Sequence, residues 1–120
     1  MHVYRDTKSI HDAHAAASGT ELGELIGSRI KELTDYGDDL SALINILVLQ
    51  PSDALTEVDA ELGFSLLDHP CDAAESHRDW FELTWVLSDD GFGVVAYVPK
   101  HPDLDPRLSA YCASLEARSP

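Results

Sequence analysis

Basic residues are scarce in this sequence of 120 residues. Eight lysines and arginines stand against twenty-two aspartates and glutamates, so the formal net charge at pH 7 is −14. Proteins that bind nucleic acid directly carry a basic patch or a stripe of basic and aromatic side chains, because the phosphate backbone is negatively charged. No such patch occurs along this chain, and we expect no direct binding to nucleic acid.

Long apolar runs are also missing. Uninterrupted runs such as Ile46–Leu49 are far shorter than the about 20 residues that a membrane-spanning helix needs. The residues that follow Met1 turn polar at once, unlike a secretory signal, in which a basic start precedes a long apolar stretch. We therefore expect a cytoplasmic protein that does not bind a membrane.

Cysteines are few, and the familiar catalytic motifs are absent. Cys71 and Cys112 lie outside any Cys-x-x-Cys pair, so we expect two reduced thiols; a disulfide between them stays open for an oxidising compartment. The sequence has no Gly-x-Ser-x-Gly, glycine-rich phosphate loop, dinucleotide fingerprint or His-Glu-x-x-His. We predict no catalytic residue and no cofactor.

The six histidines form no recognisable metal motif. His11 and His14 are spaced to share a helical face, and His69, Cys71 and His77 fall in one polar segment. These spacings match no standard structural zinc site, which needs four convergent ligands. We predict solvent-facing histidines and no metal.

Two helices are predicted in the first third of the chain. The first covers about residues 9–17. For the second, Ser18 to Glu21 match a capping box, and an amphipathic pattern follows that ends near Gly37. Its apolar residues recur at helical spacing: Leu22, Leu25, Ile26, Ile30 and Leu33.

Two more helices are predicted later in the chain. One follows Pro51, with Ser52 or Asp53 as its cap, and is closed by Gly63. The last begins at Asp105-Pro106, where aspartate can cap the helix and proline fits its first turn. Its apolar stripe consists of Leu108, Tyr111, Cys112 and Leu115.

Three strands are predicted. Residues 43–50 are apolar at both parities and rich in β-branched types, as in a strand covered on both faces. Two alternating runs around Asp90-Gly91 indicate a hairpin over residues 80–98. A two-residue turn would pair Trp85 with Ala96 and gather the large apolar side chains on one surface.

Together these elements indicate an α+β fold. We predict a small, mainly antiparallel three-stranded sheet that includes the hairpin and is packed by about four helices. A single domain over residues 1–120, with its core at about 3–117, is the simplest division. Residues 68–79 hold little that could pack, and we expect an exposed loop there.

The negative charge is concentrated in one part of the chain. No lysine or arginine occurs between Lys31 and Arg78. In this interval Asp53, Glu57 and Glu61 are spaced to share a helical face, where like charges repel. We predict that an acidic surface binds a partner protein through Asp35, Asp38, Asp39, Asp53, Glu57, Asp59 and Glu61.

Two other interpretations of the acidic surface stay open. An acidic ridge can mimic the phosphate backbone and occupy a nucleic-acid-binding protein. It can also serve only to keep the protein solvated, which the excess of aspartate over glutamate and the scarcity of lysine favour. The three interpretations differ in the partner that they imply: a basic protein, a nucleic-acid-binding protein, or none.

The hairpin region resembles known sequences. Trp80-Phe81-Glu82-Leu83 leads into Val86-Leu87-Ser88-Asp89-Asp90-Gly91-Phe92-Gly93-Val94, preceded by Pro51-x-Asp53 and Leu62-Gly63-Phe64. Over about residues 40–112 this pattern is similar to small uncharacterised bacterial proteins that are often carried on mobile genetic elements. The resemblance implies a setting in which small acidic proteins modulate other proteins, such as host defence or conjugation factors.

These observations favour a non-enzymatic accessory protein that binds a basic protein partner through its acidic surface. The alternative is a small-ligand-binding or enzymatic domain with a pocket between the sheet and the helices. A homodimer also stays open, because α+β domains often expose one edge of their sheet.

Overall fold

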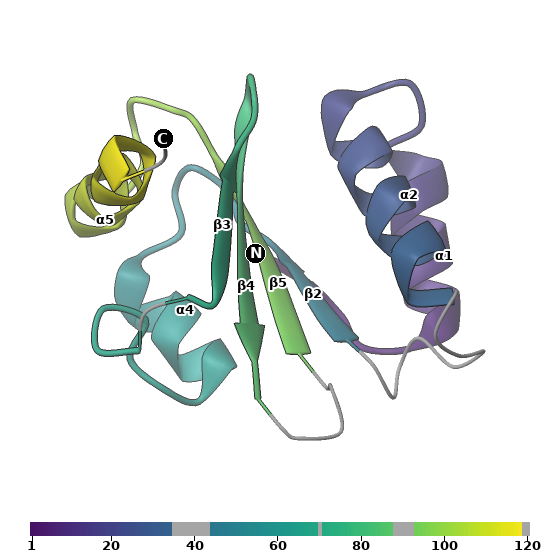
Figure 1. Cartoon of the computed structure of the whole chain (residues 1–120), viewed down its shortest axis with the longest axis horizontal. Helices are drawn as coiled ribbons and strands as arrows, with labels where there is room; N and C mark the ends of the chain where they lie inside the picture. Colours follow the sequence, from purple (N-terminus) through teal and green to yellow (C-terminus); the bar gives the residue numbers. More distant parts are fainter. Residues whose placement is uncertain (35–43, 70, 88–92, 119–120) are drawn as a thin grey trace.

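The strands of the computed structural model, which describes residues 1–34, 44–69, 71–87 and 93–118, form one mixed sheet. The strand order is β1-β2-β5-β4-β3, and Figure 1 shows this sheet nearly edge-on. β2 and β5 pair in parallel, whereas the other neighbours pair antiparallel. From β1 to β5 the strands span His2–Tyr4, Ile44–Val48, Ala73–Ser76, Trp80–Val86 and Gly93–Pro99.

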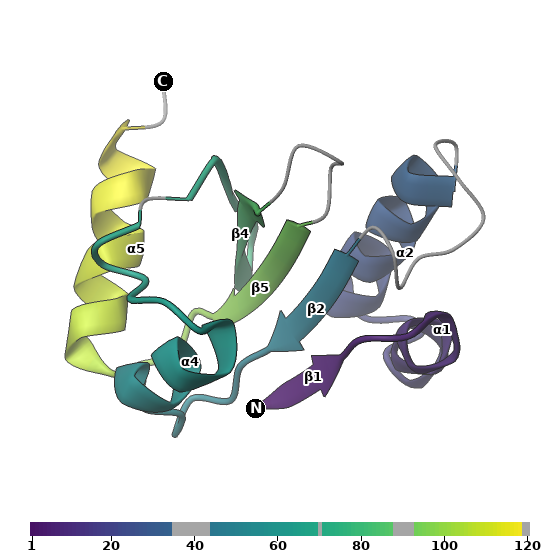
Figure 2. The same ribbon diagram turned by 90° about the horizontal axis from the view of Figure 1, so that it is seen from below.

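Helices cover both faces of the sheet. α1 (Thr7–Ala16) and α2 (Glu21–Thr34) lie on one face, and α4 (Leu55–Leu62) and α5 (Pro106–Arg118) lie on the other, as Figures 1 and 2 show. We call these the α1/α2 face and the α4/α5 face. The α+β class and the four predicted helices are confirmed within the described residues.

Each face has its own core, because alternate residues of a strand point to opposite sides. On β2, Leu47 packs into the core of the α4/α5 face, whereas Ile46 and Val48 pack into that of the α1/α2 face. The prediction that residues 43–50 hold a strand covered on both faces is confirmed for Ile44–Val48. The apolar stripe of α5 also packs as predicted, with Leu108 and Cys112 fully buried.

The predicted sheet is too small. Within the described residues the sheet has five strands and not three, and one of its four pairings, β2 with β5, is parallel. The predicted loop at 68–79 contains β3 (Ala73–Ser76), which pairs with β4 along its whole length. Its sequence, Ala-Ala-Glu-Ser, lacks the β-branched residues typical of strands, so the pairing with β4 is what makes this segment a strand.

The hairpin of β4 and β5 has a register two residues away from the predicted one. Trp85 pairs with Val94 and not with Ala96. An even shift keeps every side chain on its predicted surface, and Trp85, Val94 and Ala96 do share the α4/α5 core. Gly93 stands opposite Val86, where a Cβ atom would lie only 2.8 Å from the carbonyl oxygen of Trp85. The predicted turn at Asp90-Gly91 lies outside the described residues.

Two helix starts differ from the predicted caps. At α2 the Thr20 hydroxyl accepts a hydrogen bond from the Gly23 amide at 3.1 Å, so the cap lies two residues beyond Ser18. At α4 the residue before the helix is Ala54, and the Asp53 carboxylate instead accepts from the Gln50 amide at 2.7 Å. The predicted end of α4 at Gly63 is confirmed, with φ +82°.

Both cysteine side chains, Cys71 and Cys112, are free thiols. Burial raises the pKa of Cys112 to about 12. In the described part of the chain, every helix is too short or too polar to cross a bilayer.

Candidate functional site

The predicted acidic surface divides into residues with different roles. Asp35, Asp38 and Asp39 lie outside the described residues. Asp53 is buried, and its carboxylate forms an ion pair with the amino group of Met1 at 2.9 Å. Asp53 precedes α4 and therefore does not share a helical face with the glutamates of that helix.

The other predicted residues lie on α4, and all three have partners in the chain. Asp59 accepts a hydrogen bond from the Leu66 amide at 2.9 Å. Glu61 forms an ion pair with Arg5 of the segment after β1. Glu57 accepts a long hydrogen bond from the Ala54 amide at 3.4 Å, but it is exposed and is the residue of this set on α4 that is best placed to meet a partner protein.

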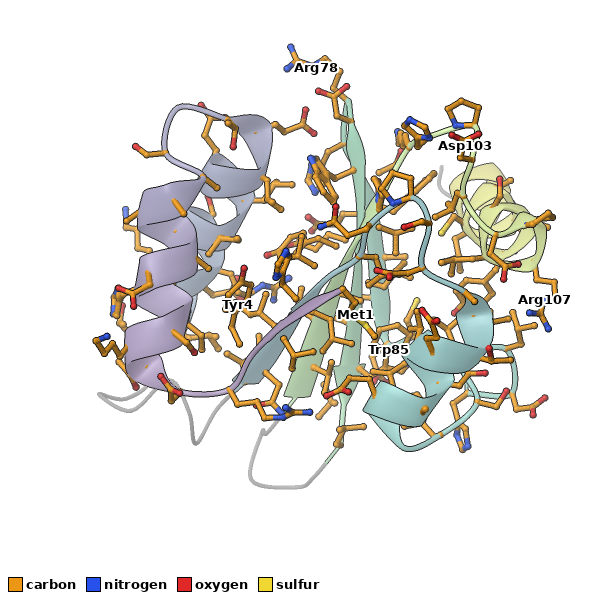
Figure 3. The ribbon with its side chains drawn as sticks, turned by 180° about the vertical axis from the view of Figure 1, so that it is seen from behind. Met1, Tyr4, Arg78, Trp85, Asp103 and Arg107 are labelled. Atoms are coloured by element: carbon orange, nitrogen blue, oxygen red, sulfur yellow. The ribbon has the colours of Figure 1, made fainter. Side chains whose placement is uncertain are left out.

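An apolar hollow opens on the α4/α5 face. It has a volume of about 350 Å³ and is lined by Phe64, His69, Asp72, Trp85, Val86 and Leu87. Val86 and Leu87 are 56% and 46% exposed, which is unusual for large apolar side chains that are neighbours. Figure 3 shows Trp85 on the side of the sheet that α4 covers.

Aromatic contacts and hydrogen bonds fix the walls of this hollow. The Trp85 ring N–H donates to the carbonyl oxygen of His69 at 3.0 Å. The Phe64 ring makes edge contacts with the ring of Trp85 and with the imidazole of His69, at centroid distances of 5.9 Å and 5.2 Å. The Val86 amide donates to the Asp72 carboxylate at 2.6 Å. The hollow is therefore formed before any partner arrives.

One carboxylate lines the hollow, and a second precedes one of its lining residues in the chain. Asp72 lines it, and the exposed Asp68 comes directly before His69. Among the described residues that line the hollow there is no lysine or arginine. An approaching segment would thus meet apolar walls and negative charge together.

A second feature, a polar cluster, lies on the α1/α2 face beneath α2. At its centre is Glu82 of β4, which is only 5% exposed. One carboxylate oxygen, Oε2, lies 3.5 Å from the Arg29 guanidinium of α2. Arg29 also donates to the Thr84 hydroxyl at 3.3 Å. Burial lowers the pKa of Arg29, but the Glu82 carboxylate, Tyr97 and Glu32 together outweigh this effect, so the pKa is raised.

The other oxygen of Glu82 faces a histidine. His77 Nε2 lies 3.6 Å from Glu82 Oε1 and 3.5 Å from Glu75 Oε2. Glu75 stands directly opposite Glu82 in the pairing of β3 with β4. A hydrogen bond to Glu82, together with burial and the Glu82 charge, raises the pKa of Glu75. Three potential ligand atoms thus lie within 4.8 Å of one another.

Two buried polar atoms at this cluster have no hydrogen-bond partner among the described residues: His77 Nε2 and the Tyr97 hydroxyl. Tyr97 is fully buried and pairs with Glu82 across β5 and β4. Burial and the nearby Glu82 carboxylate raise the pKa of its hydroxyl. Unsatisfied buried polar groups are rare in proteins because each one costs free energy.

The prediction of a solvent-facing histidine is wrong for His77, whose Nε2 atom is buried, and Glu75 lies in a strand and not in the predicted loop. Residues at positions i and i+2 of an extended segment share a face, but the sequence does not predict β3, which contains Glu75 and ends directly before His77. Glu82 offered a signal, since a charged residue between Phe81 and Leu83 in an apolar strand predicts either an exposed or a paired side chain.

Comparisons with known proteins leave the family open. No protein-family model, curated protein or solved structure matches this chain. The apolar hollow and the polar cluster are therefore the two features of the molecule that indicate its function.

Proposed function

We propose that this protein is a non-enzymatic accessory protein that binds a basic, amphipathic segment of a partner protein in the apolar hollow of the α4/α5 face. The observation that supports it best is the preformed hollow with exposed Val86 and Leu87 and a lining carboxylate. The resemblance in the hairpin region adds the proposal that the partner belongs to the setting of a mobile genetic element.

The chemistry of the hollow defines the partner. Protein interfaces combine an apolar centre with a polar rim, and aromatic pockets at the centre provide most of the binding energy. Here Trp85 and Phe64 form the walls, while Asp72 and Asp68 supply negative charge at or near the rim. A segment with an apolar anchor and flanking lysines or arginines complements both.

The net charge favours a basic partner over a second copy of this chain. Two copies at −14 each repel at low ionic strength. The same charge attracts a basic protein and accelerates its association. The predicted homodimer is therefore the weaker of the two proposals for this face.

Pull-down from a bacterial lysate at low and high salt, with mass spectrometry of the retained proteins, tests the proposal. We expect a basic protein that is retained at low salt and released at high salt. Leu87→Glu and Asp68→Lys should each reduce its retention at least about tenfold, the usual effect of a central or complementary contact. Asp12→Lys is the matched control, because it makes the same charge change at an exposed residue of α1. This helix covers the face of the sheet opposite the hollow.

Equal retention by wild type, Leu87→Glu and Asp68→Lys would exclude the hollow as the binding surface. Equal loss in Asp68→Lys and Asp12→Lys would show that net charge alone governs binding. Retention of nucleic acid, or of a nucleic-acid-binding protein that is displaced by DNA, would favour mimicry of the phosphate backbone.

A further inference from the structure

We propose that Glu75, His77 and Glu82 bind a divalent transition-metal ion, with Zn²⁺ as the first ion to test. The proposed site lies on the α1/α2 face and is independent of the hollow on the opposite face. It combines two carboxylates and one imidazole, a set of oxygen and nitrogen donors that suits zinc and its neighbours in the first transition row.

The distances between the donor atoms suit one ion. Bonds of 2.0–2.2 Å to zinc in a tetrahedral site place neighbouring donors about 3.3–3.6 Å apart. His77 Nε2 lies 3.5 Å from Glu75 Oε2 and 3.6 Å from Glu82 Oε1. Both distances are too long for good hydrogen bonds but match two edges of such a tetrahedron, and all three donor atoms lie within 4.8 Å of one another.

The local charge also favours a cation. The cavity beside the cluster, about 190 Å³ in volume, is lined by three carboxylates and one guanidinium. With His77 neutral, these groups have a formal charge of −2, which a single divalent ion would balance. Zinc needs a neutral imidazole as its ligand, so the charge count and the coordination chemistry agree.

Groups around the three donors are arranged as supports for metal ligands. Arg29 holds Glu82 Oε2 and leaves Oε1 toward His77. Ligating carboxylates in metal sites are commonly held by such outer contacts. The Tyr97 hydroxyl, fully buried beside Glu82 and without a partner among the described residues, would gain one in a water bound to the metal or in the reoriented carboxylate.

The site has a route to solvent and room for a further ligand. Glu75 is exposed and His77 is partly exposed, so an ion can enter from the side of β3. Three protein ligands leave a fourth tetrahedral position open, the arrangement found in zinc sites that bind water or a small molecule. The adjoining cavity would hold that fourth ligand.

Titration with Zn²⁺ alone, by calorimetry on metal-free protein, tests the proposal. We expect one bound ion per chain, and at least about a 100-fold loss of affinity in His77→Gln and in Glu75→Gln, since loss of even an outer contact costs 10–100-fold. Co²⁺ added in place of Zn²⁺ should give the intense visible absorption of a tetrahedral site. His69→Gln and Glu57→Gln are matched controls, because they change exposed residues of the same types away from the cluster.

Several outcomes would overturn the metal site. Wild type that binds no Zn²⁺, or that binds it with the same affinity as His77→Gln and Glu75→Gln, excludes these residues as ligands. A loss that is equally large in His69→Gln locates the ion elsewhere. Circular dichroism of Glu75→Gln, whose side chain is exposed, shows that a loss of binding is not a loss of fold. The pull-down result is separate, because the hollow contains none of the three ligands.

Discussion

Glu82 and Leu83 are neighbours on β4, yet their side chains enter opposite faces of the sheet and meet different surroundings. Leu83 is fully buried in the apolar core of the α4/α5 face. Glu82 is almost as buried, but it lies against Arg29 and His77 on the α1/α2 face. One strand therefore supplies both a core residue and the centre of a polar cluster.

The difference between Leu83 and Glu82 separates a residue that stabilises the fold from one that indicates a functional site. Burial of a leucine stabilises the fold by about 1.5–3 kcal/mol. Burial of a carboxylate costs several kcal/mol in lost hydration, and an ion pair such as Glu82 with Arg29 often only compensates for that cost. A buried charge that adds little stability is a stronger indication of function than the exposed acidic residues of α4.

The largest expected effect tests this separation directly. Leu83→Ala should lower the free energy of unfolding by about 2–5 kcal/mol, because it leaves a cavity in the core. Glu82→Gln should cost less, about 1–3 kcal/mol, since the amide fills the same space and weakens one interaction of Arg29. Guanidinium denaturation of both variants in metal-free buffer measures the two values. A Glu82→Gln cost equal to that of Leu83→Ala would assign the polar cluster a mainly structural role.

The same contrast explains which parts of the fold could be predicted from the sequence. The α4/α5 face was predictable, because its helices and its hairpin surface follow from apolar spacing and from the parity of β4 and β5. β3 was not predictable, since Ala73–Ser76 has no strand pattern and depends on pairing with β4. The parallel pairing of β2 with β5 joins segments far apart in the chain, which local patterns do not record.

The candidate sites were less predictable than the fold. The charge density predicts a binding role for Asp53, but this carboxylate is buried and is paired with the amino group of Met1 and the Gln50 amide. The polar cluster depends on the β3–β4 register, which brings Glu75 opposite Glu82. Sequence spacing can therefore indicate shared faces within one element, whereas convergence between elements requires the tertiary structure.

Acid pH should lower the stability of the α4/α5 face, because one carboxylate that joins its two helices becomes protonated. Asp105 accepts hydrogen bonds from the Leu55 amide at 3.0 Å and the Arg107 amide at 2.9 Å, and thereby joins the starts of α4 and α5. The hydrogen bond from Leu55 and those from Arg107 lower its pKa to about 2. The contribution of Asp105 is therefore present above the usual carboxyl pKa of about 3.9 and is lost as the pH falls toward 2.

Asp105→Asn separates this contribution from general acid denaturation. We expect the variant to be less stable than wild type at pH 6, and the difference in the free energy of unfolding to shrink between pH 4 and pH 2. Denaturation at a series of pH values measures it. Asp103→Asn is the control, because Asp103 is exposed and, like Asp105, lies in the segment between β5 and α5 (Figure 3). A difference that is independent of pH would mean that the Asp105 charge does not contribute.

The smallest effect compares one tyrosine from each face. On the α4/α5 face the Tyr111 hydroxyl accepts a hydrogen bond from the Cys71 amide at 3.2 Å, so Tyr111→Phe should cost about 0.5–1.5 kcal/mol. On the α1/α2 face the Tyr97 hydroxyl has no partner among the described residues. Tyr97→Phe should therefore leave the free energy of unfolding unchanged or raise it slightly when a chelator is present.

Added Zn²⁺ should make Tyr97→Phe less stable than wild type. If the hydroxyl supports the proposed metal site, wild type gains more stability from added Zn²⁺ than Tyr97→Phe does, whereas Tyr111→Phe gains as much as wild type. Thermal unfolding with chelator and with Zn²⁺ gives all six values. The opposite result would be that Tyr97→Phe is less stable than wild type in chelator and is stabilised by Zn²⁺ as much as wild type is. The hydroxyl would then contribute to the stability of the fold and not to a metal site.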